Sequence, residues 1–303
     1  MLRFIGEHIN ELLNIVLGLI MFGLGMGLKK NDFKQLFDQP RALTIGLTAQ
    51  MLLLPLVGFI LVYNSNLNPE FKVGAMLLSI CPGGITSNLV SYFVKGNIAL
   101  AVSLTVTNAV FSLFTIPLLV NQFLHYFLHS SQQGEYIQLP FFKTVLSIFM
   151  VTILPALLGM VVRYKLGKRI NLIQKYINIA LPILLLLVFA FKFLGGNGQN
   201  GSKITMDEIL DLTPIVIGLN VGAMYLGFLV GTPFGLSFKN RITIAVEVGL
   251  HNTALALLIA SEKLGMPQIE KPALVYAMFS FFITYIIAWS LVRMRLQRFK
   301  KRS

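Results

Sequence analysis

Cysteine and acidic residues are both scarce in this chain of 303 residues. The single cysteine, Cys81, excludes an internal disulfide bond. Charged residues make up only 12% of the sequence, and the 12 acidic residues are outnumbered by 25 lysine and arginine residues. So low a charge content is not compatible with a soluble globular fold. The basic residues lie in short stretches beside apolar runs rather than in a basic domain, so we expect no nucleic-acid partner.

Long apolar runs account for most of the chain. Hydrophobic residues make up 55% of the sequence, and the mean hydropathy is +0.75. A helix that crosses the hydrocarbon core of a membrane needs about 20 residues at roughly 1.5 Å of rise each. The sequence therefore predicts an all-α polytopic membrane protein, in contact with lipid, with helices at 8–28, 41–63, 71–93, 98–123, 142–163, 172–194, 209–230, 241–261 and 272–293.

The distribution of basic residues predicts the orientation of these helices. Most lysines and arginines lie in alternate connections and in the C-terminal segment, and the positive-inside rule assigns such connections to the cytoplasm. We therefore expect an outside N-terminus and a cytoplasmic C-terminus. The basic residues expected in the cytoplasm are Lys29, Lys30, Lys34, Arg41, Lys95, Arg163, Lys165, Lys168, Arg169, Lys175, Lys239, Arg241, Arg293, Arg295, Arg298, Lys300, Lys301 and Arg302.

Two of the predicted helices contain a break near mid-membrane. In segment 71–93 the sequence CPGG includes Pro82, which lacks an N–H donor, and two glycines. In segment 241–261, Gly249 lies beside the polar residues Glu247, His251 and Asn252. Backbone that leaves the helix at this depth is tolerated only inside protein or along a cavity, so both breaks indicate a binding site over a packing accident.

The two broken segments hold equivalent places in two halves of the chain. Segment 71–93 is the third of four helices, and segment 241–261 is the third of another four that begin with 172–194. The offset between the two sets is five helices, an odd number, so the second set runs opposite to the first. The sequence thus predicts an inverted structural repeat with 142–163 as the unpaired helix, an arrangement typical of secondary transporters.

Glu247 is the only acidic residue that is predicted deep in the membrane. A buried carboxylate must be protonated, paired with a basic side chain or paired with a bound ion, and no lysine or arginine is predicted at that depth. Neutral oxygen donors are available from Ser87, Asn88, Thr105 and Gln50. One carboxylate among such oxygens favours Na⁺ as the bound ion. A protonated Glu247 that is hydrogen-bonded to Asn88 is the alternative.

Other classes of site are less well supported by the residues. His251 is the only histidine in a predicted break, and a single histidine on an apolar helix is more often a packing residue than a ligand. The other histidines lie outside the helices, so no zinc site is expected. A nucleophile with its base, or a pair of membrane aspartates, is also missing, so we do not expect an enzyme. A membrane receptor would require a soluble partner domain, for which the chain has almost no residues left.

These motifs resemble the bile acid:sodium symporter family. The resemblance is carried by IMFGLGMGL at 20–28, TAQMLLLPL at 48–56, CPGGITSNLVSYFVKGNIALAVSLT at 81–105 and EVGLHNTALA at 247–256. It implies a bacterial-type, nine-helix transporter of the inner membrane, in which two broken helices cross. It further implies a panel domain of 8–28, 142–163 and 172–194 and a core domain of 41–123 and 209–293.

The resemblance also implies two sodium sites and a substrate site. Na⁺ would be the coupling ion, with no other cofactor. The first site would use Ser87, Asn88, Thr105 and Glu247. The second would use Gln50, Glu247, the carbonyls of Val248 and Leu250, and the side chain at His251. The substrate, an organic anion, would bind near Ile85, Thr86, Asn252 and Ser280.

Two positions depart from the family pattern. Ala101 stands where the first site has a further hydroxyl, and His251 stands where the second has a glutamine. The resemblance therefore implies sodium-coupled symport of an organic anion, bile-acid-like or a small carboxylate, by alternating access. The departures leave open a proton-coupled transporter, or an exporter, of the same fold.

Overall fold

The computed structural model describes residues 9–28, 39–128, 138–167, 170–194 and 202–300, and these form an all-α protein. The helices, with η for a π-helix, are α2 (Ile9–Gly27), α4 (Pro40–Thr48), η1 (Ala49–Leu53), α5 (Leu54–Tyr63), α6 (Pro69–Ile80), α7 (Ile85–Phe93), α8 (Ile98–Leu128), α9 (Phe141–Ile148), η3 (Phe149–Ile153), α10 (Leu154–Leu166), α11 (Ile170–Leu194), α12 (Met206–Val230), α13 (Phe238–Gly249), α14 (Thr253–Leu258), η5 (Ile259–Lys263) and α15 (Pro267–Lys300).

Every predicted apolar segment is helical in the described residues, and both predicted breaks are present. Segment 71–93 is divided into α6 and α7, and segment 241–261 is divided into α13 and α14. Within the described ranges, five helices are long and apolar enough to cross a membrane by themselves. They are Pro40–Tyr63, Ile98–Leu128, Phe141–Leu166, Met206–Val230 and Pro267–Gln297. The last helix begins earlier and ends later than the predicted 272–293.

Two prolines inside long helices each follow a π-helical turn. Pro55 lies just after η1, and Pro155 lies just after η3. Proline has no N–H to donate, and a turn with the wider i to i+5 bonding lets the helix continue past it. The π-turn η1 contains Gln50, one of the predicted ligands. A predicted ligand and the accommodation of a proline are therefore combined in one turn of this helix.

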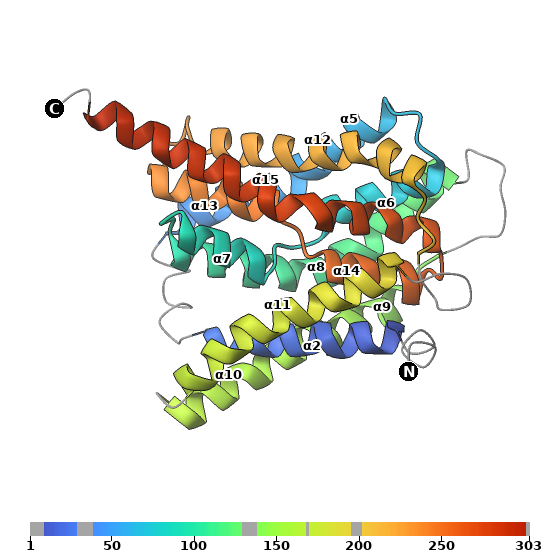
Figure 1. The fold of residues 1–303 in the computed structure, drawn as a ribbon, viewed down its shortest axis with the longest axis horizontal. Helices are drawn as coiled ribbons and strands as arrows, with labels where there is room; N and C mark the ends of the chain where they lie inside the picture. The colour runs from blue at the N-terminus through green and yellow to red at the C-terminus, as the bar shows by residue number, and fades with distance from the viewer. Residues whose placement is uncertain (1–8, 29–38, 129–137, 168–169, 195–201, 301–303) are drawn as a thin grey trace.

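The helices form two groups that lie side by side in Figure 1. In the smaller group α2 packs along α10 and α11. In the larger group α6 packs on α8 and α15, and α12 packs on α13 and α15. Contact between the groups includes that of α2 with α14. The panel and core domains, and their independent movement, stay a prediction.

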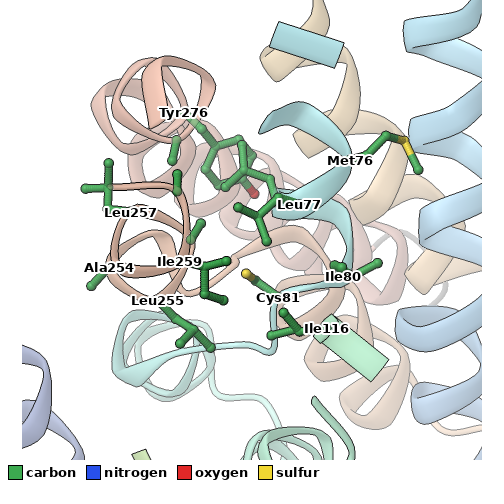
Figure 2. Close-up of a cluster of buried hydrophobic side chains, with 14 of the residues drawn as sticks. Met76, Leu77, Ile80, Cys81, Ile116, Ala254, Leu255, Leu257, Ile259 and Tyr276 are labelled. Atoms are coloured by element: carbon green, nitrogen blue, oxygen red, sulfur yellow. The ribbon is translucent and has the colours of Figure 1, made fainter. Parts of the chain in front are cut away.

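A continuous cluster of buried apolar side chains connects the end of α6, the helix after the second break and α15. Figure 2 shows Leu77 and Cys81 from the end of α6 beside Leu255 and Ile259 of the helix that follows the second break. The ring of Tyr276 from α15 lies next to Leu77. Buried apolar surface thus holds both broken helices and α15 together.

The outer surfaces of the bundle also carry large apolar side chains. Leu52, Phe142, Leu186 and Phe282 are each more than half exposed. Such exposure on helices of this length is typical of side chains that face lipid. Of the basic residues used for the orientation, Lys29, Lys30, Lys34, Lys168, Arg169, Lys301 and Arg302 lie outside the described residues.

Candidate functional site

The two helix breaks meet each other directly. Gly83 of the first break and His251 of the second form an antiparallel backbone bridge. The N–H of Asn252 donates to the carbonyl of Pro82 at 2.8 Å. Each break therefore satisfies backbone groups of the other, which is how irregular backbone is stabilised inside a membrane protein. The predicted crossing of the two segments is present.

Short-range bonds set where the helices resume after the breaks. The Asn252 side chain accepts a hydrogen bond from the N–H of Leu255 at 3.0 Å and so caps α14. After the first break, the hydroxyl of Ser87 donates to the carbonyl of Gly84 at 2.7 Å. Both half-helices thus begin at the crossing, with their N-termini near each other. Helix N-termini carry partial positive charge, which favours an anion.

Glu247 lies at the end of α13, beside the first break, and is 1% exposed. Thr105 of α8 donates its hydroxyl hydrogen to Glu247 Oε1 at 2.5 Å, and Asn88 of α7 donates to Thr105 Oγ1 at 3.3 Å. The consecutive helices α7 and α8 and the distant helix α13 thus converge on one carboxylate. The structure brings together Asn88, Thr105 and Glu247 of the predicted first site.

Gly83 leaves the space that the carboxylate occupies. A Cβ atom placed on Gly83 would lie 2.1 Å from Glu247 Oε1 and 3.3 Å from Ser87 Oγ. Ser87, which is fully buried, is therefore the fourth predicted residue beside this carboxylate. Because no real side chain tolerates a contact of 2.1 Å, glycine is required here for close approach rather than for an unusual backbone angle.

Several buried oxygen atoms near the breaks have no hydrogen-bond partner within the described part of the chain. They are Glu247 Oε2, Asn88 Oδ1 and Gln50 Oε1. Unpaired buried oxygens are costly, and a hard cation would satisfy them. The ion pairs found in the described residues leave Glu247 without a lysine or arginine partner. In the same residues no three histidine, cysteine or acidic side chains gather as a transition-metal site would require. The donor set therefore fits Na⁺ better than zinc.

The predicted second site is only partly assembled. Gln50 is buried, and its amide N–H donates to the carbonyl of Cys81 at 3.1 Å, which holds its Oε1 near the first break. His251 Nε2 lies 2.9 Å from the carbonyl of Val248. Since a carbonyl only accepts, Nε2 carries the hydrogen, and His251 binds a carbonyl that was predicted to be a ligand. Leu250 is buried in the second break.

Three polar residues beside the second break escaped the sequence analysis. Tyr276 of α15 donates its hydroxyl hydrogen to the carbonyl of Gly249, and its ring stacks on His251 with centroids 5.1 Å apart. Asn220 of α12 donates to the same carbonyl at 2.6 Å and lies 3.0 Å from Thr284 Oγ1. These residues secure the end of α13. Their signal in the sequence is an amide and two hydroxyls in the middle of apolar helices.

The four predicted substrate residues lie around the crossing, although they do not form a single group of side chains in mutual contact. Ile85 and Thr86 form the first turn of α7. A Cβ on Gly84 would lie 3.8 Å from Thr86 Oγ1 and 3.9 Å from the Cα of Asn252, so these two residues flank the same glycine. Ser280 is buried on α15 one turn after Tyr276, which places it on the face that meets the second break.

The fold and this site together define a class of protein. Broken helices that cross inside an all-α membrane protein, with a carboxylate and unpaired oxygens at the crossing, are characteristic of secondary transporters. The family model of the sodium bile acid symporter family matches residues 14–200. The chain belongs to this family, a family of sodium-dependent transporters, and it is a membrane transport protein rather than an enzyme.

Curated relatives cover most of the chain. An uncharacterized sodium-dependent transporter of Bacillus subtilis, YocS, is 30% identical over 84% of this chain and 74% of its own length. The human ileal sodium/bile acid cotransporter is 28% identical over 82% of this chain and 68% of its own. A probable chloroplastic sodium/metabolite cotransporter of rice, BASS1, is 29% identical, and the match spans only 59% of its length.

Proposed function

We propose that this protein is a secondary active transporter that couples inward Na⁺ movement to symport of an organic anion by alternating access. The observation that carries the proposal is the buried Glu247 carboxylate, whose Oε2 lacks a partner in the described residues while Thr105 and Asn88 orient the other oxygen. A bound Na⁺ would neutralise this charge and satisfy the unpaired oxygens. Membership of a sodium-dependent transporter family supports the same ion.

The first sodium site in this proposal consists of Ser87, Asn88, Thr105 and Glu247. The anion would bind on the other side of the breaks, where α7 and the helix formed by α14 and η5 begin. Ile85, Thr86, Asn252 and Ser280 would line that position, and a carboxylate there would gain from the positive ends of the helices. A bound Na⁺ would therefore favour anion binding, because it would neutralise the negative charge of Glu247 at the crossing. The substrate is a bile-acid-like molecule or a small carboxylate.

The proposed movement takes place between the two helix groups. The core domain, residues 41–123 and 209–293, carries the site past the panel domain, residues 8–28, 142–163 and 172–194. We place the N-terminus outside and the C-terminus in the cytoplasm of a bacterial inner membrane, as the basic residues indicate. Lipid, Na⁺ and the anion are then the partners of this chain.

The proposal is tested by the thermal stability of the purified protein in NaCl and in KCl of equal concentration, with and without bile acids and small carboxylates. We expect Na⁺ to raise the melting temperature and at least one anion to raise it further only in Na⁺. Uptake of that anion into proteoliposomes should be faster with a sodium gradient than with a potassium gradient. Equal stability and equal uptake in the two salts would overturn the proposal.

A second candidate function is favoured by two residues at the sites. His251 donates to the Val248 carbonyl, and Ala101 offers no hydroxyl to the first site. Fewer oxygens are thus offered to sodium, so a proton-coupled transporter or an exporter of the same fold is the alternative. Uptake that follows a pH gradient and ignores a sodium gradient would select it over the sodium symporter.

A further inference from the structure

A second buried charge pair lies away from the proposed sodium site. Lys192 Nζ is 2.5 Å from Glu270 Oε2, and the two side chains are 2% and 3% exposed. Lys192 belongs to the last turn of α11, and Glu270 belongs to the first turn of α15. Each charge lies at the helix end whose dipole favours it. The pair joins the smaller helix group to the larger one.

Glu270 is firmly attached to the larger group. A Cβ on Gly74 of α6 would lie 2.3 Å from the carbonyl of Ile269, so the backbones of α6 and α15 approach closely at this turn. The adjacent Lys271 pairs with Glu208 of α12 at 2.6 Å. The first turn of α15 thus moves with α6 and α12.

Lys192 belongs to the smaller group, because its helix α11 packs along α2. The two groups are joined by another bond near the same end, where Asn14 of α2 donates to Glu262 of η5 at 2.5 Å. In Figure 1 the end of α11 and the start of α15 lie together on the right. Both bonds would break if the groups separated at this end.

We propose that Lys192 and Glu270 form an ion-pair latch that closes the outer end of the transport path in this conformation. The inference rests on the proposed function, which places the end of α11 and the start of α15 outside. A buried ion pair is stable only while both charges are present, since either charge alone is left unpaired in an apolar interior. Opening toward the outside exposes both charges to water. The latch therefore biases the protein toward the state with the outer end closed.

The latch is tested by measuring the separation of the two groups at the opposite, cytoplasmic end. Spin labels are introduced by Tyr92→Cys on α7 and Tyr164→Cys on α10; both side chains are mostly exposed, and the native Cys81 is buried. Distance distributions are recorded by double electron–electron resonance on the full chain in KCl, without anion. We expect one main distance in the parent, and in Glu270→Gln, which leaves Lys192 unpaired at the closed end, a second, shorter distance for at least about a tenth of the molecules.

Three further variants make the result decisive. The exchanged pair Lys192→Glu/Glu270→Lys should restore most of the parent distribution, because it rebuilds the ion pair. Lys192→Met/Glu270→Leu, which leaves neither charge unpaired, should show a smaller shift and serves if Glu270→Gln does not fold. Lys271→Met is the matched control, since it breaks a pair within the larger group, and it should leave the distances unchanged.

An unchanged distribution in both Lys192→Met/Glu270→Leu and Glu270→Gln would overturn the latch, as would an equal shift in Lys271→Met. Because the measurement uses neither Na⁺ nor an anion, its outcome is independent of the sodium test. Loss of the latch with an intact sodium response would therefore leave the proposed function standing.

Discussion

Two glutamates of this protein are buried to nearly the same extent but have opposite surroundings. Glu247 is 1% exposed and Glu270 is 2% exposed. Glu270 has a permanent counter-charge in Lys192, whereas Glu247 is met by a hydroxyl and has an oxygen without a partner in the described residues. The difference shows two uses of a buried carboxylate. One is neutralised by the protein and holds helices together, and the other is the carboxylate that we propose to bind Na⁺.

The largest expected difference concerns the stability of the two glutamine variants without sodium. Glu270→Gln leaves the buried Lys192 unpaired, and breaking a buried pair costs about 3–5 kcal/mol. Glu247→Gln removes a carboxylate that has no basic partner in the described residues, so it should leave the stability in KCl unchanged or higher. Thermal unfolding of both variants in KCl measures this. Equal losses in the two variants would remove the distinction between the two glutamates.

The stabilisation by added sodium should distinguish the same two variants in the opposite order, with Glu247→Gln as the affected one. At a concentration 100-fold above its Kd, a ligand stabilises the folded state by about 2.7 kcal/mol. We expect this gain to disappear in Glu247→Gln and to persist in Glu270→Gln. The measurement is the difference in melting temperature between NaCl and KCl for each variant. A sodium response that survives in Glu247→Gln would place the ion elsewhere.

Gly83→Ala should disturb Glu247 by sterics alone. The added methyl would lie 2.1 Å from the carboxylate oxygen, and overpacking of this kind costs about 1–3 kcal/mol. Gly218→Ala on α12 is the matched control, because its methyl would meet no atom closer than 3.6 Å. We expect the sodium-dependent thermal shift to fall strongly in the first variant and to remain in the second. Equal shifts would show that the carboxylate can retreat without losing the ion.

Thr105→Val should have the smallest effect of the series. It removes the hydroxyl that orients Glu247 while keeping the shape, and we expect a sodium affinity about tenfold lower, or about 1.4 kcal/mol. Thr213→Val is the control, since the Thr213 hydroxyl donates to the Ile209 carbonyl one turn earlier, at 2.6 Å, and Thr213 is not among the predicted ligands. Titration of the melting temperature with NaCl measures both. An unchanged midpoint in Thr105→Val would exclude this hydroxyl from the site.

Much of the first site could be predicted because its residues are unusual for their surroundings. A lone carboxylate and the polar backbone of a CPGG break are both unfavourable in an apolar run unless other groups bind to them. The structure places Asn88 and Thr105 with Glu247. Their role as sodium ligands stays a prediction. The role predicted for the Val248 carbonyl is in doubt, since the side chain of His251 donates to it.

Other features could not be predicted, because they depend on which helix faces meet. Glu270 lies just before the predicted helix 272–293, where the sequence gives no sign that it is buried, and Lys192 lies in a segment 78 residues earlier. Tyr276 and Asn220 are separated by 56 residues, and they meet at the Gly249 carbonyl, where Asn220 Nδ2 also lies 3.2 Å from the Tyr276 hydroxyl. A sequence pattern locates polar residues along a helix, but the rotation of that helix against its neighbours determines what they contact.

The sequence by itself determined where the chain forms apolar helices, where two of them break and which carboxylate lies deep, because hydrophobicity and proline and glycine chemistry act locally. The tertiary structure decided the partner of each buried charge. It placed Lys192 against Glu270 and left Glu247 with neutral oxygens. The physical reason is that the energy of a buried charge depends on atoms within a few ångströms, and packing, not sequence order, sets those distances.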